Sequence, residues 1–361
     1  MVELIFAHKS FSGLTAITVT FLIAASFLVS SNRSIGHKER SAFVFCLVSL
    51  TFIALFDWAN YLLAGTHPEF RPFHLVTMAV TFAVAPMLPV SIAHAIFPPS
   101  KAFRWVGPIL IAQAVLEVAT IFLELVFTVD ATNTYHRGNL YIVYMATYCL
   151  SAIYLSVQSI RAGATYQCSS RLTICAILFV LFSGVIIQIV DPSVRTTWPS
   201  VAMAVVLYFV YYCEMVFTTD SLTMLLNRHS YDEFLRSPQL PCTIVAVDVN
   251  LFKQVNDTHG HAFGDVCLAT IAQQILRVYS RYGKCYRTGG DEFTVVLTSH
   301  QDRVDALEGA LVESLDKARQ KEPRLPGVSQ GHASADVGCT DIKSVIEQAD
   351  QMMYERKRTS R

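Results

Sequence analysis

The sequence predicts two folds in one chain: an all-α bundle of seven membrane-spanning helices over residues 1–218 and an α+β domain over residues 219–361. The first observation behind this prediction is that 53% of the 361 residues are hydrophobic and the mean hydropathy is +0.41, which is high for a soluble protein. The second is that residues 1–218 hold only 11 of the 28 Lys and Arg residues and 9 of the 28 Asp and Glu residues. Residues 1–218 are therefore predicted to form a membrane-spanning block, and residues 219–361 a polar, charged block.

Net charge and cysteine spacing argue against several other classes of protein. The formal net charge is zero and neither block is basic, so the sequence gives no sign of binding to a nucleic-acid backbone. The nine cysteines show no C-x-x-C spacing and no zinc-ligand pattern. They are interpreted as reduced, mostly buried thiols.

Seven apolar stretches have the length of roughly 17–25 residues that a helix needs to cross a bilayer. No small-residue cleavage site follows the first stretch, so it is predicted to be a span and not a signal peptide. The stretches lie at about 12–30, 42–63, 73–97, 105–127, 140–160, 172–190 and 198–218.

The loops between these stretches predict the orientation. Loops one, three and five carry seven Lys or Arg residues against one acid, Glu39, whereas each positive charge on the other side is offset by an acid. By the positive-inside rule the odd loops are cytoplasmic. The sequence therefore predicts a multi-pass protein of the inner (cytoplasmic) membrane, with its N-terminus outside and residues 219–361 in the cytosol.

Five ionisable groups fall within the predicted spans, where charge is costly. They indicate either a polar pocket or relay between helices, or side chains that are solvated near the membrane surface. Glu117 and Glu124, seven residues apart, are expected on one helix face. Because the outer loops are short, the expected signal is a small ligand within the bundle, a membrane property or a partner protein. The five groups are Asp57, His94, Glu117, Glu124 and Glu214.

The second block alternates short β-rich apolar runs with helical patterns, which predicts a mainly antiparallel sheet packed against helices. Its central feature is a hairpin that turns at Gly289-Gly290. Strands are expected at 243–247, 285–287, 293–297 and near 327–333, and helices at about 250–257, 265–279, 303–319 and 342–357.

Two carboxylates are expected to meet at one end of this sheet. Asp248 ends the first strand and Asp291 lies at the tip of the hairpin, on adjacent central strands. Such a pair can hold Mg²⁺, which prefers oxygen ligands and shares them with substrate phosphates. A site of this kind favours attack of a 3′-hydroxyl on an α-phosphorus. Asn256 and Asp265 offer the amide and carboxylate contacts that a guanine needs.

Two basic residues on the last predicted helix are expected near the phosphates. Lys357 and Arg361 are four residues apart, so both can reach one phosphate group. Taken singly, each piece has a simpler explanation: Gly-Gly-Asp is a common turn, Asp248 could cap a helix, and His259 and His261 are typical loop residues. The ordered set as a whole favours a site.

This ordered set closely resembles the GGDEF family of diguanylate cyclases over about residues 219–361. The family's D-x-L-T-G-L-x-N-R falls at 220–228, its D-x-D-x-F-K-x-x-N-D-x-x-G-H-x-x-G-D at 248–265, its G-G-D-E-F at 289–293 and its A-D-x-x-x-Y-x-x-K at 349–357. The resemblance implies a palm-like, ferredoxin-type fold related to nucleotide cyclases. It also implies a homodimer in which each domain holds one GTP and the two GTP molecules become cyclic di-GMP.

The resemblance implies roles for individual residues. Asp248, the Val249 carbonyl and Asp291 would bind Mg²⁺, or Mn²⁺ as an alternative. Asp291 would also help to activate the hydroxyl, with Glu292 beside it in the catalytic set, and Asp265 would read guanine. The substrate-binding residues that it implies are Phe252, Lys253, Asn256, His261, Asp265, Lys357 and Arg361.

The chain departs from the family pattern at a few positions. Asn250 stands for the second Asp, and Met224 and Ser360 each replace a Gly. The R-x-x-D of the family's product-inhibition site is replaced by Ser-Arg-Tyr-Gly at 280–283, so strong feedback inhibition through that site is not expected.

Three functional hypotheses remain from the sequence. The first is a membrane-anchored diguanylate cyclase controlled by a seven-span sensor. The second is a non-catalytic GTP-binding module, which would be indicated by substitutions within the G-G-D-E-F signature. The third is a transporter or ion-coupled protein with a regulatory domain, for which the mark would be solute flux that disappears on Glu117→Gln.

Overall fold

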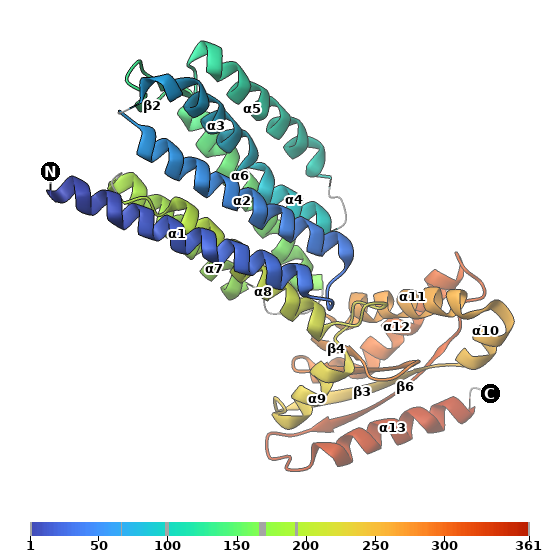
Figure 1. Ribbon diagram of the computed structural model, residues 1–361. Coiled ribbons are helices and arrows are strands. Elements are labelled where there is room, and N and C mark those ends of the chain that lie inside the picture. Colours follow the sequence, from blue (N-terminus) through green and yellow to red (C-terminus); the bar gives the residue numbers. More distant parts are fainter. Residues whose placement is uncertain (1, 66, 98–100, 166–170, 192–193, 360–361) are drawn as a thin grey trace. The chain divides into compact units, whose positions relative to one another are not determined.

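The computed structural model describes residues 2–65, 67–97, 101–165, 171–191 and 194–359 (Figure 1). Contacts group these residues into two compact units that part chiefly between Cys213 and Glu214. Each unit has its own buried core. The domain limits predicted at residues 218 and 219 stay a prediction.

The N-terminal unit is helical, as predicted. Among the described residues, seven helical stretches are long and apolar enough to cross a membrane. Large apolar side chains point outward from them, as at Phe27 and Phe122, which are 70% and 81% exposed and so suited to a lipid environment. The helices are α1 (Val2–Ser31), α2 (His37–Leu63), α3 (Arg71–Val84), α4 (Met87–Ile96), α5 (Phe103–Leu123), α6 (Tyr141–Thr165), α7 (Arg171–Val190) and α8 (Thr197–Thr218).

Two features of this unit were not expected from the hydropathy pattern. The third stretch consists of α3 and α4, which part at Ala85 and Pro86, where proline lacks the N–H that a continuous helix uses. A short antiparallel hairpin of β1 (Phe127–Val129) and β2 (Tyr135–Arg137) follows α5. Its first strand is buried against α3, α5 and α6.

The expectation that Glu117 and Glu124 share a helix face is wrong. Helix α5 ends before Glu124, which adopts the left-handed conformation with φ 54° and is exposed. Its carboxylate lies 3.5 Å from the guanidinium of Arg71. Glu117, in contrast, is fully buried and accepts a hydrogen bond from Gln113 on its own helix.

The other three groups have different surroundings. The Asp57 carboxylate pairs with Arg195 at 2.9 Å. The ring of His94 stacks on Phe103 with 5.0 Å between centroids. Glu214 is exposed. The contacts described for these groups therefore join them to other residues and not to one another.

The C-terminal unit is built on a four-stranded antiparallel sheet. The strands are β3 (Cys242–Val249), β4 (Gly283–Arg287), β5 (Glu292–Leu297) and β6 (Val328–Ala335), in the spatial order β4-β5-β3-β6. This β-α-β-β-α-β topology is the ferredoxin-like arrangement of the nucleotide-cyclase palm, which confirms the predicted fold class. All eight residues of β3 are buried, because the strand is central and covered on both faces.

Helices cover both faces of the sheet (Figure 1). Helices α11 (His261–Tyr279) and α12 (Val304–Arg319) pack on one face with a core of aliphatic residues and Phe293. Helices α9 (Arg228–Arg236) and α13 (Ile342–Thr359) pack on the other face, around Tyr231 and Tyr286. Helix α10 (Phe252–His259) connects β3 to α11.

Most expected elements are present, with two differences near the nucleotide motifs. Helix α11 begins at His261 and not near 265, because Gly260 alone breaks the chain between α10 and α11 with φ 82°. Helix α9 was not predicted, although its N-terminus is capped by Asn227, whose Oδ1 accepts from Ser230 N at 3.0 Å.

Candidate functional site

The ends of β3 and β5 bring the two predicted carboxylates to one place. Asp248 lies opposite Glu292 in the β3–β5 register, and Val249 N donates to the Asp291 carbonyl at 3.1 Å. Asp248 is buried, Asp291 is partly buried and Glu292 is exposed. Asp248, near the end of β3, and Asp291, in the turn directly before β5, therefore lie at the same end of the sheet, as the sequence predicts.

The turn before β5 is closed by its own backbone. Thr288 N and Gly289 N both donate to the Glu292 carbonyl, at 3.1 and 3.2 Å. A Cβ added at Gly289 would lie 2.7 Å from the Glu292 carboxylate, whereas one added at Gly290 would meet nothing within 4 Å. Gly290 thus leaves open space beside Asp291, which suits the close approach of a ligand to the backbone.

The first motif of the C-terminal unit is bonded to this turn. Asp220 Oδ1 accepts from Thr223 N at 2.9 Å and from Arg287 Nη1 at 3.0 Å. Arg287 Nη2 in turn donates to the Gly290 carbonyl at 2.8 Å. Burial raises the pKa of Asp220, but the hydrogen bonds from Thr223 and Arg287 outweigh it and leave the pKa below its usual value.

The predicted nucleotide contacts gather at the junction of α10 and α11. The Oδ1 atom of Asn256 is buried without a hydrogen-bond partner, and a Cβ at Gly264 would lie 1.9 Å from it. Helix α11 therefore approaches Asn256 closely only because residue 264 is glycine. His261 and Asp265 stand four residues apart on the first turns of α11, and both are exposed.

The remaining predicted substrate contacts differ in their burial and in their partners. Phe252 opens α10 and packs partly against the core, whereas Lys253 is exposed. Lys357 on α13 forms an ion pair with Asp248, with a side chain only 20% exposed. Arg361 lies outside the described residues.

The chemistry of this donor set fits Mg²⁺. Asp248 and Asp291 supply hard carboxylate oxygens at the same end of the sheet. Mg²⁺ uses one or two protein carboxylates and completes its shell with phosphates and water. Among the described residues, the cluster with three close His, Asp or Glu groups lies elsewhere, at Asp305, Glu308 and His332.

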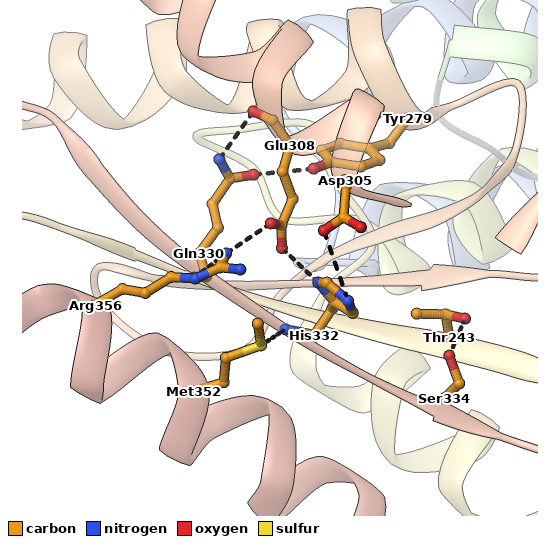
Figure 2. A network of polar contacts seen from close by, with 9 residues as sticks. All are labelled: Thr243, Tyr279, Asp305, Glu308, Gln330, His332, Ser334, Met352 and Arg356. Atoms are coloured by element: carbon orange, nitrogen blue, oxygen red, sulfur yellow. Dashed lines mark hydrogen bonds and ion pairs between the residues drawn. The ribbon is translucent and has the colours of Figure 1, made fainter. Parts of the chain in front are cut away.

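That second cluster belongs to a polar network that the sequence did not reveal (Figure 2). It joins α12 to the edge strand β6 and to α13 through an ion pair between Glu308 and Arg356 at 2.6 Å. The signal that was available is the run of polar residues at alternate positions of β6, Gln330, His332 and Ser334.

Comparison with known proteins places the C-terminal unit in a family. The family profile described as diguanylate cyclase, GGDEF domain, matches residues 217–361. The probable diguanylate cyclase DgcF of Escherichia coli K12 is 30% identical over 158 residues, which are 39% of this chain and 49% of that protein. Diguanylate cyclase DgcZ of the same strain is 30% identical over 167 residues, which are 43% of this chain and 55% of that protein.

A solved structure with a similar sequence is the GGDEF domain of DgcB from Caulobacter crescentus in complex with c-di-GMP. It is 28% identical and covers 40% of this chain and 92% of that chain, with a TM-score of 0.34. The chain spans about half or less of the length of the first curated relatives that it matches. The profile match and the intact signature at 289–293 together show that residues 217–361 are a GGDEF domain.

Proposed function

We propose that this chain is a membrane-anchored diguanylate cyclase that condenses two GTP molecules into cyclic di-GMP and two pyrophosphates, under the control of its seven-helix region. The observation that carries the proposal is that Asp248 and Asp291 lie together where β3 ends and β5 begins, within a GGDEF domain whose signature is intact. An intact signature also disfavours the non-catalytic alternative.

Asp248, the Val249 carbonyl and Asp291 are the residues that would hold the metal. When bound there, Mg²⁺ or Mn²⁺ supplies the positive charge that neutralises the triphosphate. Lys357 exchanges its contact with Asp248 for one with a phosphate oxygen, because phosphate offers a denser negative charge. Asp291, with Glu292 beside it, takes the proton from the attacking 3′-hydroxyl.

The junction of α10 and α11 binds the base. Asn256 provides a buried oxygen that lacks a partner, and Asp265 is exposed and able to accept the two N–H groups on the edge of guanine. Phe252 and Lys253 on α10 and His261 on α11 are the further substrate contacts that the family resemblance implies, and Arg361 is the phosphate contact that it implies. Burial of an unpaired amide oxygen is unfavourable, so a ligand that donates a hydrogen bond is stabilised there.

The proposed reaction has consequences for the oligomeric state and the location of the protein. One domain binds one GTP and the reaction consumes two, so the active form is a homodimer. GTP is cytosolic, which agrees with the orientation expected from the loop charges, with the seven helices in the inner membrane. The signal is a small ligand, a membrane property or a partner.

The test is turnover of the full-length protein in lipid nanodiscs with GTP and Mg²⁺. Asp291→Ala and removal of the metal with EDTA should each abolish cyclic di-GMP synthesis, whereas Asp302→Ala, at an exposed aspartate outside the four sequence motifs, should leave it unchanged. Wild-type turnover by Asp291→Ala would refute the assignment. GTP binding without product by the wild type would instead favour the non-catalytic module.

A further inference from the structure

The free edge of β6 is covered by side chains from α13. Strand β6 lies at the border of the sheet, so its outward backbone groups need partners from elsewhere. Arg356 Nη1 donates to the Gln330 carbonyl at 3.1 Å, and His332 N donates to Met352 Sδ at 3.4 Å (Figure 2). Helix α13 is thereby fixed along the strand at two points one turn apart.

Arg356 is held from a second direction by α12. The same Nη1 atom lies 2.6 Å from Glu308 Oε2, and the Glu308 side chain is only 9% exposed. The other oxygen of Glu308 lies 3.0 Å from His332 Nδ1. Gln330 completes the network, because its Nε2 donates to the Glu308 carbonyl at 3.1 Å and its Oε1 accepts from the Tyr279 hydroxyl at 2.9 Å.

This arrangement argues for an ion-pair network and against a metal centre. Asp305, Glu308 and His332 lie close enough to share a cation, but the Arg356 guanidinium already occupies one oxygen of Glu308. A cation at this place would have to displace that guanidinium or bear its repulsion. The network therefore joins four elements, α11, α12, β6 and α13, through side chains that are mutually satisfied.

Arg356 directly precedes Lys357, the residue that pairs with Asp248. Both lie in the last turns of α13, which ends at Thr359. The last turns of a helix lack part of their backbone hydrogen bonds and open readily unless side chains hold them. Arg356 provides such a restraint on one side of the helix, and Lys357 reaches the site from another.

We propose that Glu308 and Arg356 are positioning residues for Lys357. By bonding to Glu308 and to the β6 edge, Arg356 keeps the last turn of α13 in place, so that the Lys357 ammonium stays at the end of β3 where the phosphates of GTP bind. The proposal rests on the proposed function, since it assigns these residues to the binding of GTP.

The expected effect is on GTP affinity. Glu308→Gln keeps the shape of the side chain and removes its charge, so Arg356 loses its ion pair and the last turn of α13 is released. Loss of a partner that orients a metal ligand commonly costs about 10–100-fold in affinity or activity, and we expect an effect at the lower end of this range for a partner that orients a phosphate-binding lysine. We expect the KM for GTP to rise about tenfold with kcat nearly unchanged, because the phosphate contact is made equally in the ground and transition states.

The decisive experiment is a double-mutant cycle in full-length protein in nanodiscs, read out as the Kd of Mg·GTP and as KM. Glu308→Gln alone should weaken binding about tenfold, but it should add no further loss in a Lys357→Met background, because the two residues act through one contact. Arg356→Lys, which keeps the charge, should retain part of the affinity. Asp316→Asn, on the same helix as Glu308, removes a carboxylate whose ion pair among the described residues is with Arg319 of α12, and this variant should bind Mg·GTP as the wild type does.

Two results would overturn the proposal: wild-type affinity in both Glu308→Gln and Arg356→Ala, or losses in Glu308→Gln and Lys357→Met that multiply in the double variant. A purely structural role predicts the second result together with a lowered Tm. Failure of the proposed function is recognised separately, because the wild type would then make no cyclic di-GMP, whatever the variants do.

Discussion

Gly331 on β6 lies where the backbone of α13 approaches the sheet closely. A Cβ added there would lie 2.2 Å from Met353 N, 2.5 Å from the Ala349 carbonyl oxygen and 2.7 Å from Met353 Cα. These are backbone atoms of a helix and cannot rotate away as a side chain would. Because ordinary van der Waals contact begins at 3.4 Å, Gly331→Ala requires α13 to retreat by roughly 1 Å.

Two consequences follow from this displacement. The free energy of unfolding of the C-terminal unit should fall by about 1–3 kcal/mol, which is the usual cost of an added methyl group in a packed core. Lys357 lies on the same helix, so its ammonium should move away from Asp248. A misplacement of about 1 Å can cost as much as 100-fold in rate, so a loss of about 10–100-fold in kcat/KM is expected.

The assay combines hydrogen exchange of β6 and α13 peptides with cyclic di-GMP production by the full-length protein. Gly309→Ala is the matched control, since Gly309 is exposed on α12 and a Cβ there meets nothing within 4 Å. It should stabilise the helix by about 0.4–1 kcal/mol and leave turnover unchanged. Wild-type exchange and turnover in Gly331→Ala would show that the close contact between β6 and α13 is not formed.

Two further predictions concern Asp220, which is bonded to the turn before β5 through Arg287, and Asp265, which is proposed to bind guanine. The pKa of Asp220 lies below its ordinary 3.8, so its pairing stabilises the fold above pH 3.8, and this contribution is lost as the pH falls through the folded-state pKa. Asp220→Asn should therefore lower the resistance of the protein to urea at pH 7. The difference between this variant and the wild type should vanish in strong acid. A difference that persists unchanged to acid pH would contradict this reasoning. Asp265→Asn should reduce the preference for GTP over ATP by about 10–100-fold in competition binding, because a charged acceptor for the guanine edge is lost; an unaltered preference would place guanine recognition elsewhere.

The sheet and the two carboxylates that are proposed to bind the metal could be predicted because their signals are local. The apolar run 243–247 requires a buried strand, Asp248 follows it directly, and Gly289-Gly290 specifies the turn that carries Asp291. These features depend on neighbours within a few residues. The succession of short apolar runs and helical patterns therefore predicted the fold class, and the positions of Asp248 and Gly289-Gly290 predicted the end of the sheet at which the two carboxylates meet.

The network around Arg356 could not be predicted in the same way. Glu308 and Arg356 are 48 residues apart on different helices, and neither stands out from the charged residues around it. The pair forms only because α12 and α13 flank the edge of β6, which is a property of the whole topology. The same reason explains the error at Glu117 and Glu124, where helical spacing was extended past the point at which α5 ends.

The bonds from Asp220 through Arg287 to the Gly290 carbonyl have a mechanical consequence. The chain enters the GGDEF domain at Phe217, whose carbonyl accepts from Asn227 Nδ2 at 2.6 Å, and Leu226 N donates to the Cys285 carbonyl on β4 at 3.0 Å. Within the C-terminal unit, the entry segment is therefore bonded both to β4 and to the turn that follows it. A displacement of this segment would be passed through these hydrogen bonds to the hairpin that carries Asp291.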